Sequence, residues 1–197
     1  MNTLRANIRQ HILNTAKPLI LGKGFSAVGL NEILTAAAVP KGSFYHYFKS
    51  KELFGEALLE SYFADYLAQI DDLLGNQAVS AAGRLMNYWR SWLEAQSRCG
   101  IEGTCLAVKL GGEVCDLSEP MRLALRQGTD QIIARLAACI SAGLADGSLT
   151  GEIDTRHMAQ TLYEIWLGAT LLTKMRHDSS AMDGAMLATL SLLNLTR

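Results

Sequence analysis

The stretch from Leu30 to Phe48 constrains this chain most, because its pattern fits two short helices separated by an abrupt break. In its first half, apolar residues recur at i, i+3, i+4 and i+7, as on one face of a helix. They are Leu30, Ile33, Leu34 and Ala37. Pro40 restricts Val39 to extended conformations, so the first helix should end before it. Proline also suits the first turn of a helix, which predicts a second helix from Lys41 to Tyr47.

The second helix combines an apolar side with a cationic and hydroxylated side. Phe44 and Phe48 are expected to hold it on a core, while Lys41 and Ser43, in its first turn, face outward. A helix-turn-helix that enters the DNA major groove has this arrangement. The candidate DNA-binding residues are Lys41, Gly42, Ser43, Tyr45, His46, Tyr47, Lys49, Lys51, Asn31 and Thr35. Lys41 and Ser43 are expected at base edges, and Tyr45 and His46 at phosphates or a thymine methyl group. Lys51 is expected at a phosphate, whereas Tyr47 either contacts DNA or belongs to the core.

The distribution of charge supports a nucleic-acid partner. Residues 1–51 hold seven basic residues and one acidic residue, Glu32, for a net charge of +6. Because the whole chain carries −1, residues 52–197 carry −7. Neutralisation of phosphates by Lys and Arg dominates DNA affinity, so the basic first quarter marks the expected DNA-binding face. The alternative is a solvated basic surface with no ligand.

Composition excludes several other classes of protein. A chain of 197 residues allows one or two domains, and it has no run of about eighteen apolar residues that predicts a membrane span. The N-terminus lacks the apolar segment of a secretory signal, so we expect a cytoplasmic protein with reduced thiols. The four cysteines at 99, 105, 115 and 139 lack metal-site spacing, so neither a metal nor a cofactor is expected.

The rest of the chain reads as helices with few interruptions. Ser50 is a good N-cap for a helix over 51–74 with Leu53 among its inward residues, and Asp154 is a good N-cap for a later helix. A helix over 104–114 is expected to be interrupted at Gly111-Gly112. Together these patterns predict an all-α fold.

A specific set of residues in the first third resembles the DNA-binding head of TetR-family transcriptional repressors. The residues that agree are Gly24-Phe25, Leu30 to Leu34, Ala37, Val39, Lys41-Gly42, Phe44-Tyr45, Tyr47-Phe48 and Ser50-Lys51-Glu52. The resemblance implies a three-helix DNA-binding head over 1–50 and a larger helical effector-sensing and dimerisation body over 51–197, about nine helices in total. One departure is Ala38, where the family usually has glycine in the turn.

A second stretch is similar to the branch of the TetR family that responds to N-ethylmaleimide and other electrophiles. It comprises residues 103–110 and 113–119. This resemblance implies that Cys105 is a reactive thiol and that Lys174 belongs to the sensing chemistry. Lys109, one helical turn from Cys105, favours a thiolate, and Cys115 is a candidate secondary thiol. The alternative is that Cys105 is a small buried apolar residue, as we expect of Cys99 and Cys139.

Two further groups of residues are assigned to the body. Aromatic residues at helical spacing either line an apolar effector pocket or form ordinary core; they are Trp89, Trp92, Tyr163 and Trp166. In the family, the last two helices pair with their symmetry mates in a homodimer. The candidate interface residues are Ala169, Leu172, Met182, Met186, Leu190 and Leu193.

The sequence therefore predicts a dimeric repressor of an operator in double-stranded DNA, released when an electrophile or oxidant modifies a body cysteine. The alternative within the family is induction by a small apolar ligand that binds without a covalent bond. An enzyme is disfavoured, since no nucleophile-base grouping, glycine-rich phosphate loop or metal set is present. An architectural DNA binder without an effector is disfavoured by the large acidic body. The operator, the inducer and the direction of regulation are not encoded in any of these patterns.

Overall fold

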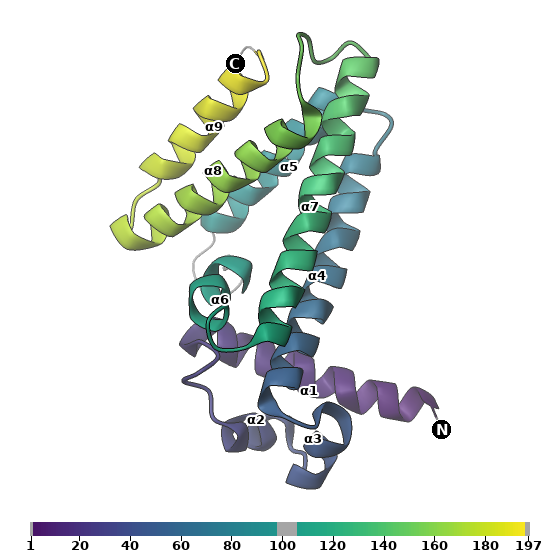
Figure 1. The fold of residues 1–197 in the computed structure, drawn as a ribbon, viewed down its shortest axis with the longest axis vertical. Coiled ribbons are helices and arrows are strands. Elements are labelled where there is room, and N and C mark those ends of the chain that lie inside the picture. Colours follow the sequence, from purple (N-terminus) through teal and green to yellow (C-terminus); the bar gives the residue numbers. More distant parts are fainter. Residues whose placement is uncertain (1, 98–105, 196–197) are drawn as a thin grey trace. The chain divides into compact units, whose positions relative to one another are not determined.

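A computed structural model describes residues 2–97 and 106–195, and the side chains of 7–96 and 106–195. Over these residues the chain forms helices and no strands (Figure 1), which confirms the all-α prediction. The helices are α1 (Asn2–Lys23), α2 (Leu30–Ala37), α3 (Lys41–Phe48), α4 (Lys51–Gly75), α5 (Ala81–Ser97), α6 (Leu106–Val114), α7 (Glu119–Ala145), α8 (Thr155–Arg176) and α9 (Ser180–Leu192). None of these helices is long and apolar enough to cross a membrane.

The chain divides into two compact units that do not follow the order of the sequence. The first unit comprises residues 1–65 and 100–128, and the second comprises 66–99 and 129–197. Helices α4 and α7 therefore contribute to both units, and α6 belongs to the first unit with α1, α2 and α3. The division into a head and a body at residue 50 concerns function and stays a prediction.

In the first unit, α1, α2 and α3 pack around a small apolar core at the start of α4. Ile12 and Ile20 of α1, Ile33 of α2 and Phe44 of α3 are fully buried. Full burial of one such side chain stabilises the fold by about 1.5–3 kcal/mol relative to leaving it exposed. The ring Nε2 of His11 on α1 also lies 3.0 Å from the carbonyl oxygen of Ala37, where α2 ends.

Helix ends follow the capping residues that the sequence predicts. The N–H of Leu53 donates to Ser50 Oγ at 3.1 Å, and the N–H of His157 donates to Asp154 Oδ1 at 3.0 Å. Both are side-chain caps that satisfy an otherwise unpaired donor.

Two local predictions are wrong. Helix α6 runs unbroken through Gly111 and Gly112, because Leu110 and Val114 are fully buried and hold it, and the space around both glycines is open. Each glycine makes the helix about 1 kcal/mol less stable than alanine would, and the burial of the neighbouring side chains offsets this loss. Leu53 is exposed rather than inward, because it lies in the first turn of α4, outside the stripe that contains Phe54 and Leu58.

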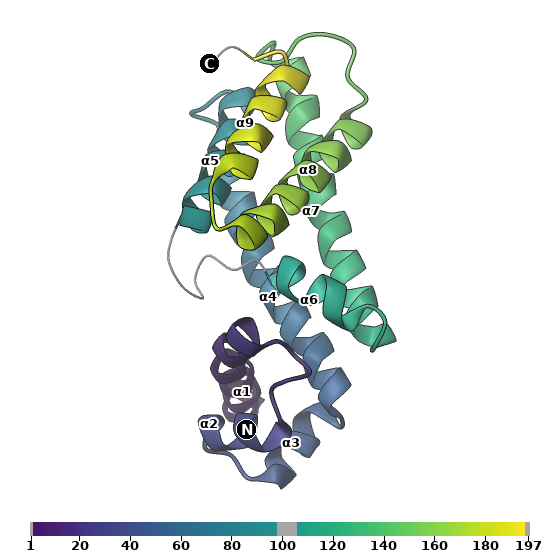
Figure 2. The same ribbon diagram turned by 90° about the vertical axis from the view of Figure 1, so that its left-hand side faces the viewer.

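In the second unit, α9 lies alongside α8 and α5 (Figures 1 and 2). The loop after α7 caps the start of α5 from outside: the N–H of Ala81 donates to Asp146 Oδ2 at 2.9 Å, and that of Ala82 donates to Ser148 Oγ at 3.0 Å. Two donors that α5 cannot pair by itself are thus satisfied across 65 and 66 residues of sequence.

Candidate nucleic-acid interface

The turn between α2 and α3 is tight because one residue adopts a left-handed conformation. Ala38 has φ 52° and ψ 41°, and its N–H donates to the carbonyl oxygens at the end of α2. Pro40, with ψ 153°, then starts α3 in extended conformation. Both boundaries agree with the sequence prediction. The left-handed conformation of Ala38 is one that glycine tolerates better.

Helix α3 is fixed on the first unit by a cluster of three aromatic rings. The ring centroids of Phe44, Phe48 and Phe54 lie 5.1–5.4 Å from one another, and all three side chains are buried. Tilted and edge-on contacts at this distance are favourable for aromatic pairs. The prediction that Phe44 and Phe48 hold α3 on its core is confirmed, and the opposite side of α3 is left free for a ligand.

The candidate DNA-binding side chains on α3 are accessible to solvent. Lys41, Tyr45 and His46 are exposed, and Ser43 and Tyr47 are half-buried. Lys49, which directly follows α3, is exposed as well. Nothing packs over Gly42, since a Cβ there meets no atom within 4 Å. The ammonium of Lys41 lies 5.9 Å from the centre of the Tyr45 ring, which places a cation beside an exposed aromatic face. Together these side chains form a polar, cationic ridge along α3.

The other candidates differ in their exposure to solvent and in their hydrogen bonds within the protein. On α2, Asn31 and Thr35 are exposed, although the Thr35 hydroxyl donates to the Asn31 carbonyl at 2.8 Å. Lys51 Nζ donates to the Phe25 carbonyl at 2.9 Å and lies 4.7 Å from the centre of the Phe25 ring. Lys51 is therefore engaged inside the first unit, and a phosphate contact from it stays a prediction.

The expected sensor residues are distributed over both units. Cys105, like Cys99, lies outside the described residues. Lys109 on α6 and Cys115, which follows α6, belong to the first unit, whereas Lys174 on α8 belongs to the second. Cys115 is free and half-buried, and Lys109 Nζ lies 3.4 Å from the carbonyl oxygen of Gly22.

The thiol of Cys139 differs from an activated cysteine. It is buried and donates to the Ala81 carbonyl at 3.4 Å. Burial raises the pKa of the Cys139 thiol above its ordinary value, which disfavours the reactive thiolate. This agrees with the expectation that Cys139 is inert.

The four aromatic candidates of the second unit, Trp89, Trp92, Tyr163 and Trp166, are all buried. Trp89 and Trp166 are stacked with ring centroids 4.9 Å apart, and both are fully buried. The indole N–H of Trp92 donates to Thr170 Oγ1 at 3.1 Å, and that of Trp166 donates to Thr189 Oγ1 at 2.9 Å. The buried indole N–H of Trp89 has no hydrogen-bond partner among the described residues. The burial of all four rings favours the core alternative, and a role for them in ligand binding stays a prediction.

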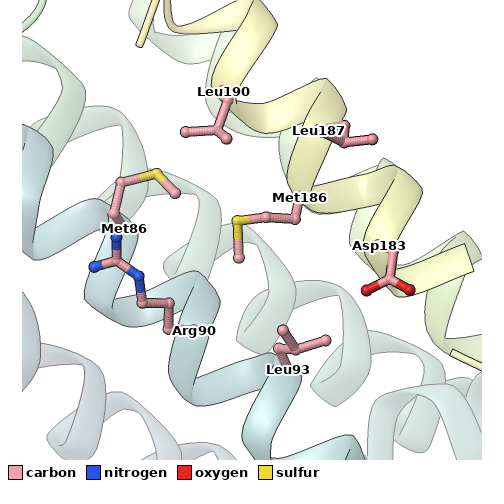
Figure 3. A pocket seen from close by; sticks show the side chains of 7 residues that line it. All are labelled: Met86, Arg90, Leu93, Asp183, Met186, Leu187 and Leu190. Atoms are coloured by element: carbon pink, nitrogen blue, oxygen red, sulfur yellow. The ribbon is translucent and has the colours of Figure 1, made fainter. Parts of the chain in front are cut away.

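An apolar groove lies between α5 and α9 of the second unit (Figure 3). Its volume is about 490 Å³. The residues that line it are Met86, Arg90, Leu93, Asp183, Met186, Leu187 and Leu190. Met186 and Leu190, expected in a dimer interface, thus point into this groove.

The remaining interface candidates fall into two groups. Ala169, Met182 and Leu193 are buried inside the protomer, so they lie beneath its surface and not on it. Leu172 is exposed, and it neighbours two further exposed apolar side chains on α8, Leu171 and Met175.

Comparison with known proteins identifies the family to which this chain is similar. Residues 12–58 match the profile "Bacterial regulatory proteins, tetR family", and residues 81–189 match "Tetracyclin repressor-like, C-terminal domain". The chain is 40% identical to the HTH-type transcriptional repressor NemR of Escherichia coli strain K12 over 90% of this chain and 89% of that protein. It is 31% identical to the HTH-type transcriptional repressor DhaR of Mycobacterium sp. strain GP1, over 91% and 88% of the two chains.

A solved structure supports the same assignment. The crystal structure of the reduced form of E. coli NemR superposes with a TM-score of 0.87 at 39% identity, covering 95% of this chain and 98% of that one. The similarity extends over both matched regions, the helix-turn-helix and the helices that follow α4. This chain therefore belongs to the TetR family of DNA-binding transcriptional repressors and is close to NemR.

Proposed function

We propose that this chain acts as a homodimer that leaves its operator when an electrophile or oxidant modifies Cys105. The observation that carries the DNA-binding part is the polar, cationic ridge of α3, presented outward by the buried ring cluster of Phe44, Phe48 and Phe54. One short helix reads few base pairs. Two copies related by a two-fold axis reach successive major grooves about 34–36 Å apart, which is why a dimer is proposed.

Roles on the ridge follow from chemistry and reach. Lys41 and Ser43, in the first turn of α3, are placed to donate to base edges, and lysine pairs well with guanine O6 and N7. Tyr45 and His46, one turn further on, suit phosphate oxygens or a thymine methyl group. The net charge of +6 on residues 1–51 supplies the salt-dependent attraction that every such complex needs.

The proposed signal is covalent. The Cys105 thiolate adds to an electrophilic carbon such as the alkene of N-ethylmaleimide: a C–S bond forms, the C=C double bond becomes single, and the adjacent carbon takes a proton from solvent. In the sequence, Cys105 is the neighbour of Leu106, the first described residue of α6, and Lys109 lies in the first turn of that helix. A helix N-terminus and a nearby cation both favour a thiolate. Cys115 is the second candidate, as a partner thiol in oxidation.

The groove between α5 and α9 supports a second candidate function, reversible induction by a small apolar molecule. Its volume lies within the range of ligand sites in proteins. The thioethers of Met86 and Met186 adapt to varied apolar shapes. In this alternative, differential affinity of the ligand for two arrangements of the body causes release, and no thiol is consumed.

A gel-shift assay with the DNA upstream of this protein's own gene separates these functions. N-ethylmaleimide should release wild-type protein, and removal of the free reagent should not restore binding. Cys105→Ser should bind and not respond, whereas Cys115→Ser, the matched control, should still respond. If Cys105→Ser responds as wild type does, the proposal for Cys105 fails and another thiol, such as Cys115, becomes the candidate sensor. If neither protein responds, the groove becomes the candidate site.

A further inference from the structure

The turn between α1 and α2 is held by a carboxylate from a distant helix. The N–H of Phe25 donates to Glu113 Oε2 at 3.1 Å, and the N–H of Ser26 donates to Glu113 Oε1 at 2.6 Å. Glu113 lies on α6, 88 and 87 residues further along the chain. Hydrogen bonds to an ionised acceptor are about twice as strong as neutral ones, so this double contact is a specific attachment.

The backbone of the turn is shaped to receive that carboxylate. Gly24 has φ +94°, a conformation that favours glycine. A Cβ on Gly24 would lie 2.9 Å from Glu113 Oε2, closer than real Cβ atoms approach. The missing side chain therefore lets the carboxylate reach the two amides that follow.

The same turn is also attached to α4. Lys51 Nζ donates to the Phe25 carbonyl at 2.9 Å and lies 4.7 Å from the ring centre. The Phe25 ring packs against Gly55, where a Cβ would come within 2.7 Å of Phe25 Cε2. Phe25 is thus held through its N–H by α6 and through its carbonyl and ring by α4, so a shift of α6 must either move the turn or break the contact with Glu113.

We infer that Glu113 is a coupling residue, whose carboxylate transmits displacement of α6 to the α1–α2 turn and thereby to the helix-turn-helix. Helix α6 has nine residues, and three of them, Leu106, Leu110 and Val114, are fully buried. We therefore expect α6 to shift as one rigid helix. The inference rests on the proposed function for the signal that moves α6. The contact itself does not depend on that signal.

A double-mutant cycle read by hydrogen–deuterium exchange tests the coupling without DNA or inducer. Val114→Ala loosens α6 from its buried side. In the wild-type background it should raise exchange in a peptide covering 22–29 several-fold. In a Glu113→Ala background, where exchange of the Phe25 and Ser26 amides is already about tenfold faster, Val114→Ala should add little. Equal increments in both backgrounds would overturn the inference, as would unchanged exchange in Glu113→Ala.

A binding experiment supplies the functional arm. Glu113→Ala should bind the upstream DNA within a few-fold of wild type, but N-ethylmaleimide should weaken its binding much less than it weakens that of wild type. Glu119→Ala, which removes a nearby carboxylate bonded to Arg122, is the matched control and should respond normally. A wild-type response in Glu113→Ala overturns the coupling. If wild type itself does not respond, the proposed electrophile function fails, and the exchange cycle alone decides the coupling.

Discussion

At the scale of single residues, Ala38 carries a conformation that its side chain disfavours. Its φ of 52° is in the left-handed region, which costs an L-residue about 1–2 kcal/mol. We predict that Ala38→Gly raises the free energy of unfolding by about 0.5–1 kcal/mol, since relief of this strain exceeds the entropy that glycine adds to the unfolded chain. Urea denaturation followed by circular dichroism measures the change.

The control for that substitution lies two residues earlier. Ala36 is exposed and inside α2, where glycine costs about 1 kcal/mol. Ala36→Gly should therefore destabilise the protein. Destabilisation of similar size by Ala38→Gly would show that the left-handed conformation carries no strain worth relieving.

Lys41 provides the corresponding test of recognition. Lys41→Ala, which removes this charge, should weaken binding to the upstream DNA roughly tenfold. If the ammonium also neutralises a phosphate, the slope of log K against log salt should fall in magnitude by about 0.9. Fluorescence anisotropy at several salt concentrations measures both quantities. Arg176→Ala, at the end of α8 in the second unit, should change neither; identical behaviour of the two variants would remove Lys41 from the interface.

At the scale of elements, the sequence predicted best where one residue determines a boundary. Pro40, Ser50 and Asp154 each act through local backbone chemistry, so the helices beside them begin and end close to where the pattern places them. Predictions that required a knowledge of packing were weaker. Gly111-Gly112 does not interrupt α6, and the groove between α5 and α9 is lined mainly by methionines and leucines that the aromatic pattern did not indicate.

Glu113 shows why part of the site was out of reach of sequence reasoning. Its partners are backbone amides 87 and 88 residues away. Almost every residue type has a backbone N–H, so the sequence does not show which residues donate to Glu113. The one local signal is Gly24-Phe25. This pair is among the residues that resemble the family, but the sequence alone did not explain why a glycine is needed there. A contact of this kind emerges only when the fold brings α6 to the turn.

The start of α5 gives an element-scale prediction on pH. Hydrogen bonds from the Ser148 side chain and from the N–H groups of Ala81 and Ser148 hold the pKa of Asp146 below its ordinary value of 3.8. A lowered pKa means that the stabilisation is present above the ordinary value and is lost as pH falls through the lowered one. Asp146→Ala should therefore destabilise the protein at pH 7, and its difference from wild type should shrink below pH 3.8.

Thermal unfolding over a pH series measures this effect. Asp72→Ala, at an exposed position on α4, is the control and should have little effect at any pH. A difference between wild type and Asp146→Ala that does not depend on pH would mean that the lost packing, and not the ionised cap, is responsible.

At the scale of the whole molecule, the exposed apolar face of α8 needs an explanation. Leu171, Leu172 and Met175 are 46%, 40% and 66% exposed, which is unusual for neighbouring large apolar side chains. We predict that this face is covered in the homodimer and that Leu172→Glu shifts the protein to monomer in analytical ultracentrifugation. DNA affinity should fall with it, because a monomer presents one recognition helix instead of two.

Leu123→Glu is the matched control for the dimer. Leu123 is similarly exposed at 37%, but it lies on the part of α7 that belongs to the first unit. This variant should sediment as wild type does. If Leu172→Glu also remains dimeric, another surface of the protomer forms the interface.

In the proposed function, chemistry at one thiol controls occupancy of the operator. The most direct measurement is a single titration with N-ethylmaleimide in which intact-protein mass spectrometry reports the fraction alkylated, peptide mapping identifies the cysteine, and anisotropy reports the fraction of DNA bound. Loss of bound DNA should follow alkylation of Cys105, and later alkylation of the other cysteines should add nothing. Full alkylation of Cys105 with the operator still bound would contradict it.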